Sequence, residues 1–227
     1  MPHPVDVDEH KNIQLKHKTV ERCRNDYIFA FCRKDYCDVS FYNKLKKPST
    51  ASPEFKRGFT TLFEDNPKPV VFFLCYDIGD RPEIKTFIRH VICCVAVREK
   101  ESIYVFAFDM RNMNDIAKGH AQYLERQLKQ ITDSPLSIHV VNASCLEKPS
   151  CHYLQRFKAF EDPGWCMAWA LFFLDAVICR PVWKGKHVYE LSVAELKHAF
   201  ARIYRLVDDE LKKHGNGFIE QWYELGL

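Results

Sequence analysis

Residues 161–178 read Glu-Asp-Pro-Gly-Trp-Cys-Met-Ala-Trp-Ala-Leu-Phe-Phe-Leu-Asp-Ala-Val-Ile. Asp162 is suited to cap the first free N–H groups of a helix, and Pro163 fits its first turn, so the segment predicts a helix start. From Trp165 onward every residue except Asp175 is apolar, which is typical of a helix buried on all sides. At 1.5 Å per residue this helix makes only about four turns, too few to cross a bilayer. We therefore expect it in the middle of a protein core.

Cys166 lies in the first turn of this helix, a position that favours a reactive thiolate. The unpaired N–H groups and the positive end of the helix dipole stabilise an anion there, and cysteine pKa values fall to roughly 3.5–7.5 in such settings. The alternative for a cysteine in an apolar run is a small buried hydrophobic side chain. The groups that the rest of the chain supplies decide between the two interpretations.

The composition predicts one domain that follows a short arm. With 227 residues, 47% of them hydrophobic, the chain can bury a substantial core. Residues 1–17 are polar and without a clear period, which predicts a flexible arm, and residues 18–227 form the expected domain. The net charge of +3, from 33 basic and 30 acidic residues, predicts no general attraction to nucleic acid or to an anionic membrane. Nucleic acid remains a candidate only as an activator.

The ten cysteines are too sparse for a small disulfide scaffold, and the first ten residues contain no apolar signal segment. We therefore expect an intracellular protein in a reducing compartment. Cys23, Cys32 and Cys37 are spaced more widely than the Cys-x-x-Cys pairs of finger-like zinc sites. The adjacent Cys93 and Cys94 fall in a strand-like run and would face opposite sides of a sheet. The sequence accordingly predicts neither a metal nor a cofactor.

Periodicity and turn residues predict the elements before the central helix. Apolar residues at helical spacing predict a helix over 18–32, and the basic stretch Lys44–Arg57 reads as a loop. Three strands are expected at 70–76, 87–97 and 102–108, with a charged turn at Arg98–Glu101 making the last two a hairpin. Asn112 or Asn114 can cap a helix that runs to Ile131, and 136–141 is a further strand.

The strongest helix signal follows the central segment. Ser192-Val-Ala-Glu195 is a capping box, and Lys212-Lys213-His214-Gly215 is a matching basic last turn and stop. A short terminal helix is expected over 218–225. The helices at 192–226 would then complete the domain.

Side chains suited to thiol chemistry occur in a suggestive order along the chain. A thiolate nucleophile needs a base, a group that orients the base, and donors for the oxyanion of the tetrahedral intermediate. The predicted hairpin brings His90 and Asp109 to the same end of a sheet, where Asp109 would fix the histidine tautomer. The amide of Gln155 and the backbone N–H of Cys166 would form the oxyanion hole.

The order His90, Asp109, Gln155, Cys166, with a helix and a strand between the hairpin and the cysteine helix, resembles a known superfamily. It is similar to the adenain and ubiquitin-like-protein proteases, which are papain-like cysteine peptidases. Gly164-Trp165-Cys166-Met-Ala-Trp169 is similar to the Gly-(Tyr/Trp)-Cys-x-x-Trp segment of divergent members encoded by large DNA viruses. The resemblance covers residues 70–180.

The resemblance implies both a fold and an activity. The fold is an α+β papain-like domain, in which a central helix packs on a mainly antiparallel sheet among surrounding helices, with a catalytic core at about 70–180. The activity is that of a thiol protease, a hydrolase, with Cys166 as nucleophile, His90 as base, Asp109 as orienting acid and Gln155 as oxyanion donor. The implied partners are protein or peptide substrates, either viral precursors or ubiquitin-like conjugates, in a host cytoplasm or a virion. Neither a membrane nor a particular oligomeric state is implied.

Several alternatives stay open at this point. His139 and His152 are further histidines, and Asp115 is an alternative acid to Asp109. Trp165 and Trp169 are expected to pack in the core, with a wall of the substrate cleft as the alternative for Trp165. Asp175 is expected either to be paired in the core or to face a rim. The same fold used without catalysis, as a binding or virion structural protein, is the first rival function. A thiol acyltransferase on the same triad and a zinc-dependent nucleic-acid binder are the others.

Overall fold

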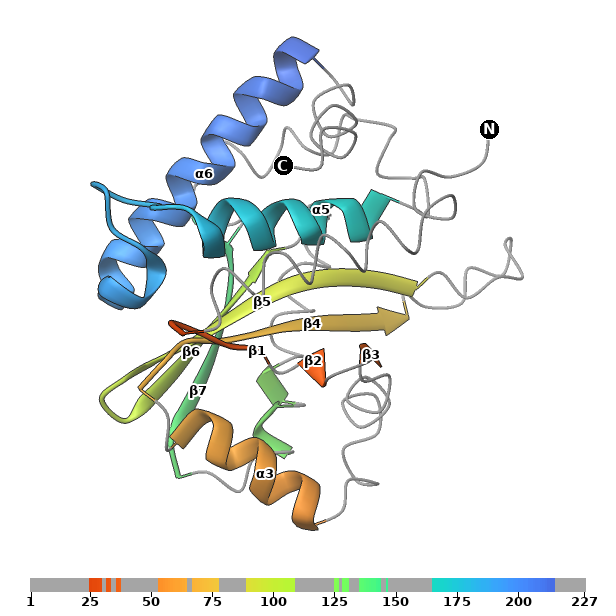
Figure 1. Ribbon diagram of the computed structural model, residues 1–227, viewed down its shortest axis with the longest axis vertical. Helices are drawn as coiled ribbons and strands as arrows, with labels where there is room; N and C mark the ends of the chain where they lie inside the picture. The colour runs from red at the N-terminus through yellow and green to blue at the C-terminus, as the bar shows by residue number, and fades with distance from the viewer. Residues whose placement is uncertain are drawn as a thin grey trace.

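The structure is a computed structural model, shown in Figure 1. It describes residues 25–29, 32–33, 36–37, 53–64, 67–77, 89–108, 125–126, 128–130, 135–143, 146 and 165–214, and all structural statements below refer to these residues. The expected arm at 1–17 and the expected terminal helix at 218–225 lie outside them.

The described residues form an α+β fold around a mixed sheet. Its strands stand in the order β1 (Ile28–Phe29), β4 (Val70–Asp77), β5 (Arg89–Glu99), β6 (Ser102–Phe108) and β7 (Ser137–Asn142). Strands β4, β5 and β6 pair antiparallel, whereas β1 pairs parallel to β4 and β7 pairs parallel to β6. The prediction of a mainly antiparallel sheet was therefore wrong at both edges. A separate antiparallel pair joins β2 (Cys32–Arg33) and β3 (Tyr36–Cys37).

The three predicted strands between residues 70 and 108 are confirmed, and their register is regular. Strands β5 and β6 form the predicted hairpin, which turns between Glu99 and Ser102. Lys100 occupies the turn with φ at 55°, the left-handed region that a tight turn requires. Strands β4 and β5 pair one residue for one over eight consecutive positions, from Val70 opposite Ala96 to Asp77 opposite Arg89. No bulge interrupts this pairing, so alternate residues keep to one face of the sheet along its whole length.

The central helix is present where the sequence predicts it. It begins as α5 (Trp165–Phe173) and continues as the π-helical segment η6 (Leu174–Cys179). Side chains from Trp169 to Ile178 are buried except for the half-buried Ala176, which confirms the prediction of a helix apolar on every side. Asp175 is only 4% exposed and forms an ion pair with Arg180, with 3.0 Å between Oδ2 and Nη2. The expected pairing of this buried carboxylate is thereby confirmed.

Two hydrophobic clusters lie on the two faces of the sheet. The face that we call the α5 face carries Val71, Cys93, Val95, Phe106 and Phe108, which pack with α5, η6 and α6 (Val193–His214). The opposite face, the α3 face, carries Val70, Phe72, Ile92, Cys94 and Ala96, and packs with Leu62 of α3 (Pro53–Glu64) and with Leu128. Figure 1 shows α5 and α6 on one side of the sheet and α3 on the other. Cys93 and Cys94 therefore face opposite sides, as predicted.

The helix α6 begins at the predicted capping box. Ser192 donates from its N–H and its hydroxyl to Oε2 of Glu195, at 3.0 and 2.9 Å, and the Glu195 N–H donates to Ser192 Oγ at 3.3 Å. A second carboxylate, from Glu99 of the hairpin, accepts from the Val193 N–H at 3.2 Å. The start of α6 is thus fixed both locally and by the sheet. Before it lies a short 3-10 turn, η7 (Val188–Glu190).

Replacing Ser192 by alanine is expected to destabilise the protein by about 1 kcal/mol, the usual cost of losing a helix cap. The hydrogen bonds from Ser192 hold the pKa of Glu195 below its ordinary value. The contribution of this carboxylate is therefore present above its pKa in the unfolded chain and is lost as the pH falls through its folded pKa. Urea titrations at neutral and acidic pH measure both effects. Equal stability of the variant and the wild type at neutral pH would contradict the role of the cap.

Two predictions near the N-terminus were wrong. The helix expected over 18–32 is absent where the structure describes that segment, because Ile28–Phe29 pairs as β1 with Val70–Val71 and the Ile28 N–H donates to the Pro69 carbonyl at 3.0 Å. The loop expected over Lys44–Arg57 gives way at Pro53 to α3, for which proline is a favourable first residue. Residues 44–52 lie outside the described ranges.

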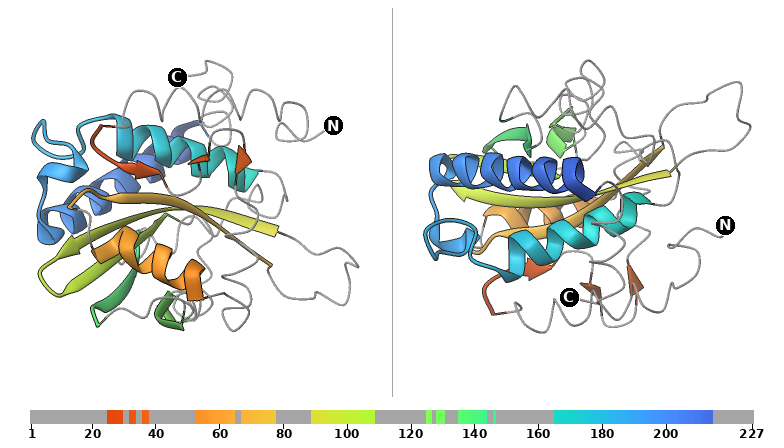
Figure 2. Two further views of the ribbon diagram at one scale, coloured as in Figure 1. Left: turned by 60° about the horizontal axis from the view of Figure 1, so that its bottom comes forward. Right: turned by 90° about the horizontal axis from the view of Figure 1, so that it is seen from above.

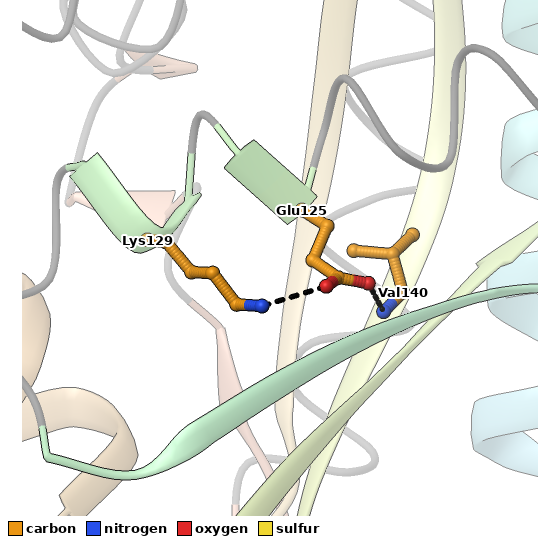
Figure 3. Close-up of polar contacts among 3 residues, drawn as sticks. All are labelled: Glu125, Lys129 and Val140. Atoms are coloured by element: carbon orange, nitrogen blue, oxygen red, sulfur yellow. Dashed lines mark hydrogen bonds and ion pairs between the residues drawn. The ribbon is translucent and has the colours of Figure 1, made fainter.

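The segment that leads from β6 to β7 is helical at 125–126 and 128–130, within the helix predicted to end at Ile131. Figure 3 shows how it contacts β7. The Glu125 carboxylate accepts from Lys129 Nζ at 2.7 Å and from the Val140 N–H at 3.4 Å. Burial tends to raise the pKa of Glu125, but these donors outweigh it and lower that pKa. The carboxylate therefore satisfies a backbone donor of β7, an edge strand of the sheet.

Candidate active site

Cys166 is the second residue of α5, so the structure confirms its place at the start of the central helix. Apart from that helix start, α5 offers no charge of its own, because its nine residues are all uncharged. The N–H groups of its first turn and the positive end of its dipole are the local source of stabilisation for a thiolate. The other cysteines whose burial is described differ from this setting. Burial strongly raises the pKa of the Cys93 thiol, and Cys179 ends η6, where the dipole has the opposite sign.

His90 is the second residue of β5, opposite Tyr76 of β4. Helix α5 packs on β5, and the starts of the helix and of the strand lie at the same end of this packed pair, as Figures 1 and 2 show. The backbone thus brings Cys166 and His90 to the same end of the molecule. Their side chains lie outside the described set.

The register adds a constraint that the sequence does not reveal. Phe73, Cys93 and Val95 pack on the α5 face, so the alternating positions 75, 77, 89 and 91 belong to that face. The position of His90 alternates instead with Ile92 and Cys94 of the α3 face. A contact between His90 and Cys166 therefore has to be made around the end of the sheet, beyond the last pair, Asp77 and Arg89.

The two other predicted site residues lie outside the described residues. Strand β6 ends at Phe108, opposite Cys93 and at the end of the hairpin away from its turn, and Asp109 is the next residue. Gln155 belongs to the segment between β7 and α5. The structure neither joins these two residues to the site nor separates them from it.

His139, an alternative base in the sequence, lies far from this end of the sheet. It pairs with Tyr104, close to the hairpin turn, and its ring stacks on that of Tyr104 with 5.1 Å between centroids. Lys197 Nζ lies 5.4 Å from the centroid of the same tyrosine ring. We therefore assign His139 to this surface cluster and not to the site at Cys166. His152 and Asp115 lie outside the described ranges.

Two residues at the end of the sheet were not singled out in the sequence. Asp77 and Arg89 are directly opposite each other, on positions of the α5 face. The available signal was the alternation of residues in the predicted strands, which places positions 89 and 93 on one face. It could not be used without knowing which face the central helix covers.

No metal centre or membrane span emerges within the part of the chain that the structure describes. There, no three His, Cys, Asp or Glu residues lie close enough to hold a metal ion. Among the same residues, no helix is both long enough and apolar enough to cross a membrane.

Comparisons with known proteins give only remote similarity. No protein-family model and no curated protein matches the sequence. Two structures of the effector protein RavZ of Legionella pneumophila are similar at TM-scores of 0.30 and 0.26, with 10% and 11% sequence identity. The matches cover 77% and 78% of this chain but 48% and 49% of the RavZ chains, so this chain spans about half the length of these neighbours. Similarity at this level does not establish a shared fold.

Proposed function

We propose that this chain is a thiol-dependent peptidase or isopeptidase. The observation that carries the proposal is the position of Cys166 in the first turn of a buried central helix, at the end of the sheet where β5 begins with Arg89 and His90. This setting combines a helix N-terminus, which stabilises a thiolate, with a histidine whose backbone lies at the same end. The papain-like fold implied by the sequence resemblance is part of the proposal.

In the proposed reaction, His90 takes the proton of the Cys166 thiol, and the thiolate attacks the carbonyl carbon of the substrate amide. The backbone N–H of Cys166 and the amide of Gln155 stabilise the resulting oxyanion. The tetrahedral intermediate then collapses, the C–N bond breaks, and the imidazolium protonates the leaving amine. Water activated by His90 hydrolyses the thioester and restores the thiol. Asp109 orients the imidazole throughout. The proposed substrates are viral precursor proteins or ubiquitin-like conjugates, in a reducing compartment.

One observation favours a second candidate function. The β4–β5 register places His90 on a position of the α3 face, whereas α5 packs on the opposite face. If the histidine does not reach Cys166 around the end of the sheet, the thiol has no base at this position. The chain would then be a binding or virion structural protein without catalytic activity.

The proposal is tested by labelling the purified protein with an electrophilic probe of the peptide or ubiquitin type and mapping the modified cysteine by mass spectrometry. Modification is expected at Cys166 and is expected to disappear in Cys166→Ser. The matched control is Cys179→Ser, which removes the half-buried thiol at the other end of the same helix and is expected to leave labelling unchanged. Labelling spread evenly over several cysteines would contradict an activated Cys166.

A further inference from the structure

The end of the sheet beside the start of α5 carries an oppositely charged pair of positions. The β4–β5 register is continuous to its last pair, in which Asp77 lies directly opposite Arg89. Residues directly opposite each other in an antiparallel pair share a face of the sheet, and an acidic and a basic residue so placed attract each other. Asp77 and Arg89 therefore occupy directly opposite positions and carry opposite charges.

The shared face is the one on which the central helix packs. Phe73 and Cys93 are opposite each other and pack with the residues of α5 and η6. Positions 77 and 89 are each four residues further towards the strand ends, an even number, so they belong to the same face. Helix α5 begins at this end of the sheet, as Figures 1 and 2 show. These two positions and the helix start that bears Cys166 are thus on one face and at one end.

The described elements around Cys166 provide few charges. Helix α5 has none. On the adjoining ends of β4 and β5, the ionisable residues on α5-face positions are Cys75, Asp77 and Arg89, while His90 and Tyr76 occupy α3-face positions. Among these groups, Arg89 is the cation whose position shares the face of α5. An opposite charge within about 4–6 Å of an acidic group lowers its pKa by roughly 1–3 units.

We propose that Arg89, at the position opposite Asp77, is a positioning residue that stabilises the Cys166 thiolate. The inference rests on the proposed function and deepens it, because it supplies the thiolate with a cation on the face that α5 covers.

The test is the pH dependence of Cys166 alkylation by iodoacetamide, read by mass spectrometry of the peptide that contains this cysteine. Arg89→Gln is expected to raise the midpoint of the alkylation profile by about one pH unit or more, because the thiolate loses a nearby cation. Arg89→Lys keeps the charge and is expected to stay near the wild type.

The matched control is Arg98→Gln, on the same strand. Arg98 is an exposed arginine nine positions along β5, about 30 Å away at 3.3 Å per residue, well beyond the Debye length of about 10 Å at 0.1 M salt. Its replacement is expected to leave the midpoint unchanged. A purely structural role of Arg89 would lower stability in denaturant titration without moving the midpoint.

An unchanged midpoint in Arg89→Gln would overturn the inference. If that variant does not fold, as judged by circular dichroism, an unchanged midpoint in Arg89→Met, which keeps an apolar stem without the charge, overturns it equally. These outcomes differ from a failure of the proposed function. Alkylation by iodoacetamide requires no substrate turnover. Even if no peptidase probe modifies the protein, the alkylation profile therefore still shows whether Arg89 acts on the Cys166 thiol.

Discussion

Replacing Phe173 by alanine is expected to lower the free energy of unfolding by about 3–5 kcal/mol, a large part of the 5–15 kcal/mol typical of a folded protein. Phe173 is fully buried at the end of α5. Its ring lies 5.2 Å from those of Phe108 in β6 and Tyr204 in α6, measured between centroids, and also contacts Trp169 and Phe172. One truncation therefore opens a cavity where the central helix, the sheet and α6 meet.

Denaturant titration measures this loss, and two variants make the result specific. Phe173→Leu keeps most of the buried volume and is expected to lose clearly less stability, because the cost depends on the cavity that remains. Leu206 lies on α6 and is 53% exposed. Leu206→Ala is therefore expected to change the free energy of unfolding by no more than about 0.5 kcal/mol. If Phe173→Ala costs no more than Leu206→Ala, the packing of α5 against β6 and α6 is wrong.

The sequence predicted those elements whose signals are local. A segment with apolar residues on every side, such as the one after Trp165, needs burial whatever surrounds it, and α5 with η6 is the result. The capping box at Ser192 is likewise complete within four residues, and the hairpin turn at Lys100 lies between two clearly apolar strands. Each of these three predictions depended on neighbours in the chain and was confirmed.

The errors fall where structure depends on distant pairing. Val20, Cys23, Tyr27 and Phe31 have helical spacing, but this spacing cannot reveal that Ile28 pairs with a strand that begins more than forty residues later. Pairing and burial in the core, where Tyr27 is 3% exposed, override the local preference. The parallel pairing of β6 with β7 also follows a long connection, and strand patterns alone do not give its direction.

Pro53 shows a different kind of error. Within a basic and proline-containing stretch it reads as a loop residue, although proline is equally favoured in the first turn of a helix. The helix α3 that it opens contributes Leu62 to the α3 face of the sheet. The choice between these two meanings of proline depends on whether the following apolar residues have a surface to cover, and this is a tertiary property.

For the candidate site, the sequence predicted which end of the strands and which end of the central helix lie together. It did not predict which face of the sheet the helix covers. The hairpin fixes the end of the sheet at which β5 starts, and this follows from the turn at residues 98–101. The face on which α5 packs does not follow from the strands themselves, because residues 92–96 are apolar on both faces. The positions of His90 and Arg89 relative to Cys166 therefore needed the register and the packing together.

Replacing His90 by alanine is expected to reduce the rate of the proposed hydrolysis by about 10²–10⁴-fold, the usual contribution of a general base. The measurement is kcat/KM for a fluorogenic peptide or ubiquitin-like substrate that the wild type cleaves. The second-order rate of probe labelling at Cys166 gives the same comparison without turnover. The matched control is His139→Ala, which removes an exposed histidine from the other end of the sheet, where it stacks on Tyr104. Wild-type rates are expected for this control.

The result for His90 also shows whether its imidazole reaches Cys166 past the end of the sheet. A large loss of rate, with stability unchanged in denaturant titration, would mean that the imidazole reaches Cys166 from an α3-face position by passing the end of the sheet beyond the Asp77 and Arg89 pair. Such a path is open only to the first residues of a strand, and His90 is the second residue of β5. A rate equal to that of the wild type, with Cys166 still labelled, would exclude His90 as the base. The thiolate would then depend on the helix N-terminus and the α5-face positions alone, as expected of a binding protein that keeps a reactive cysteine without a catalytic triad.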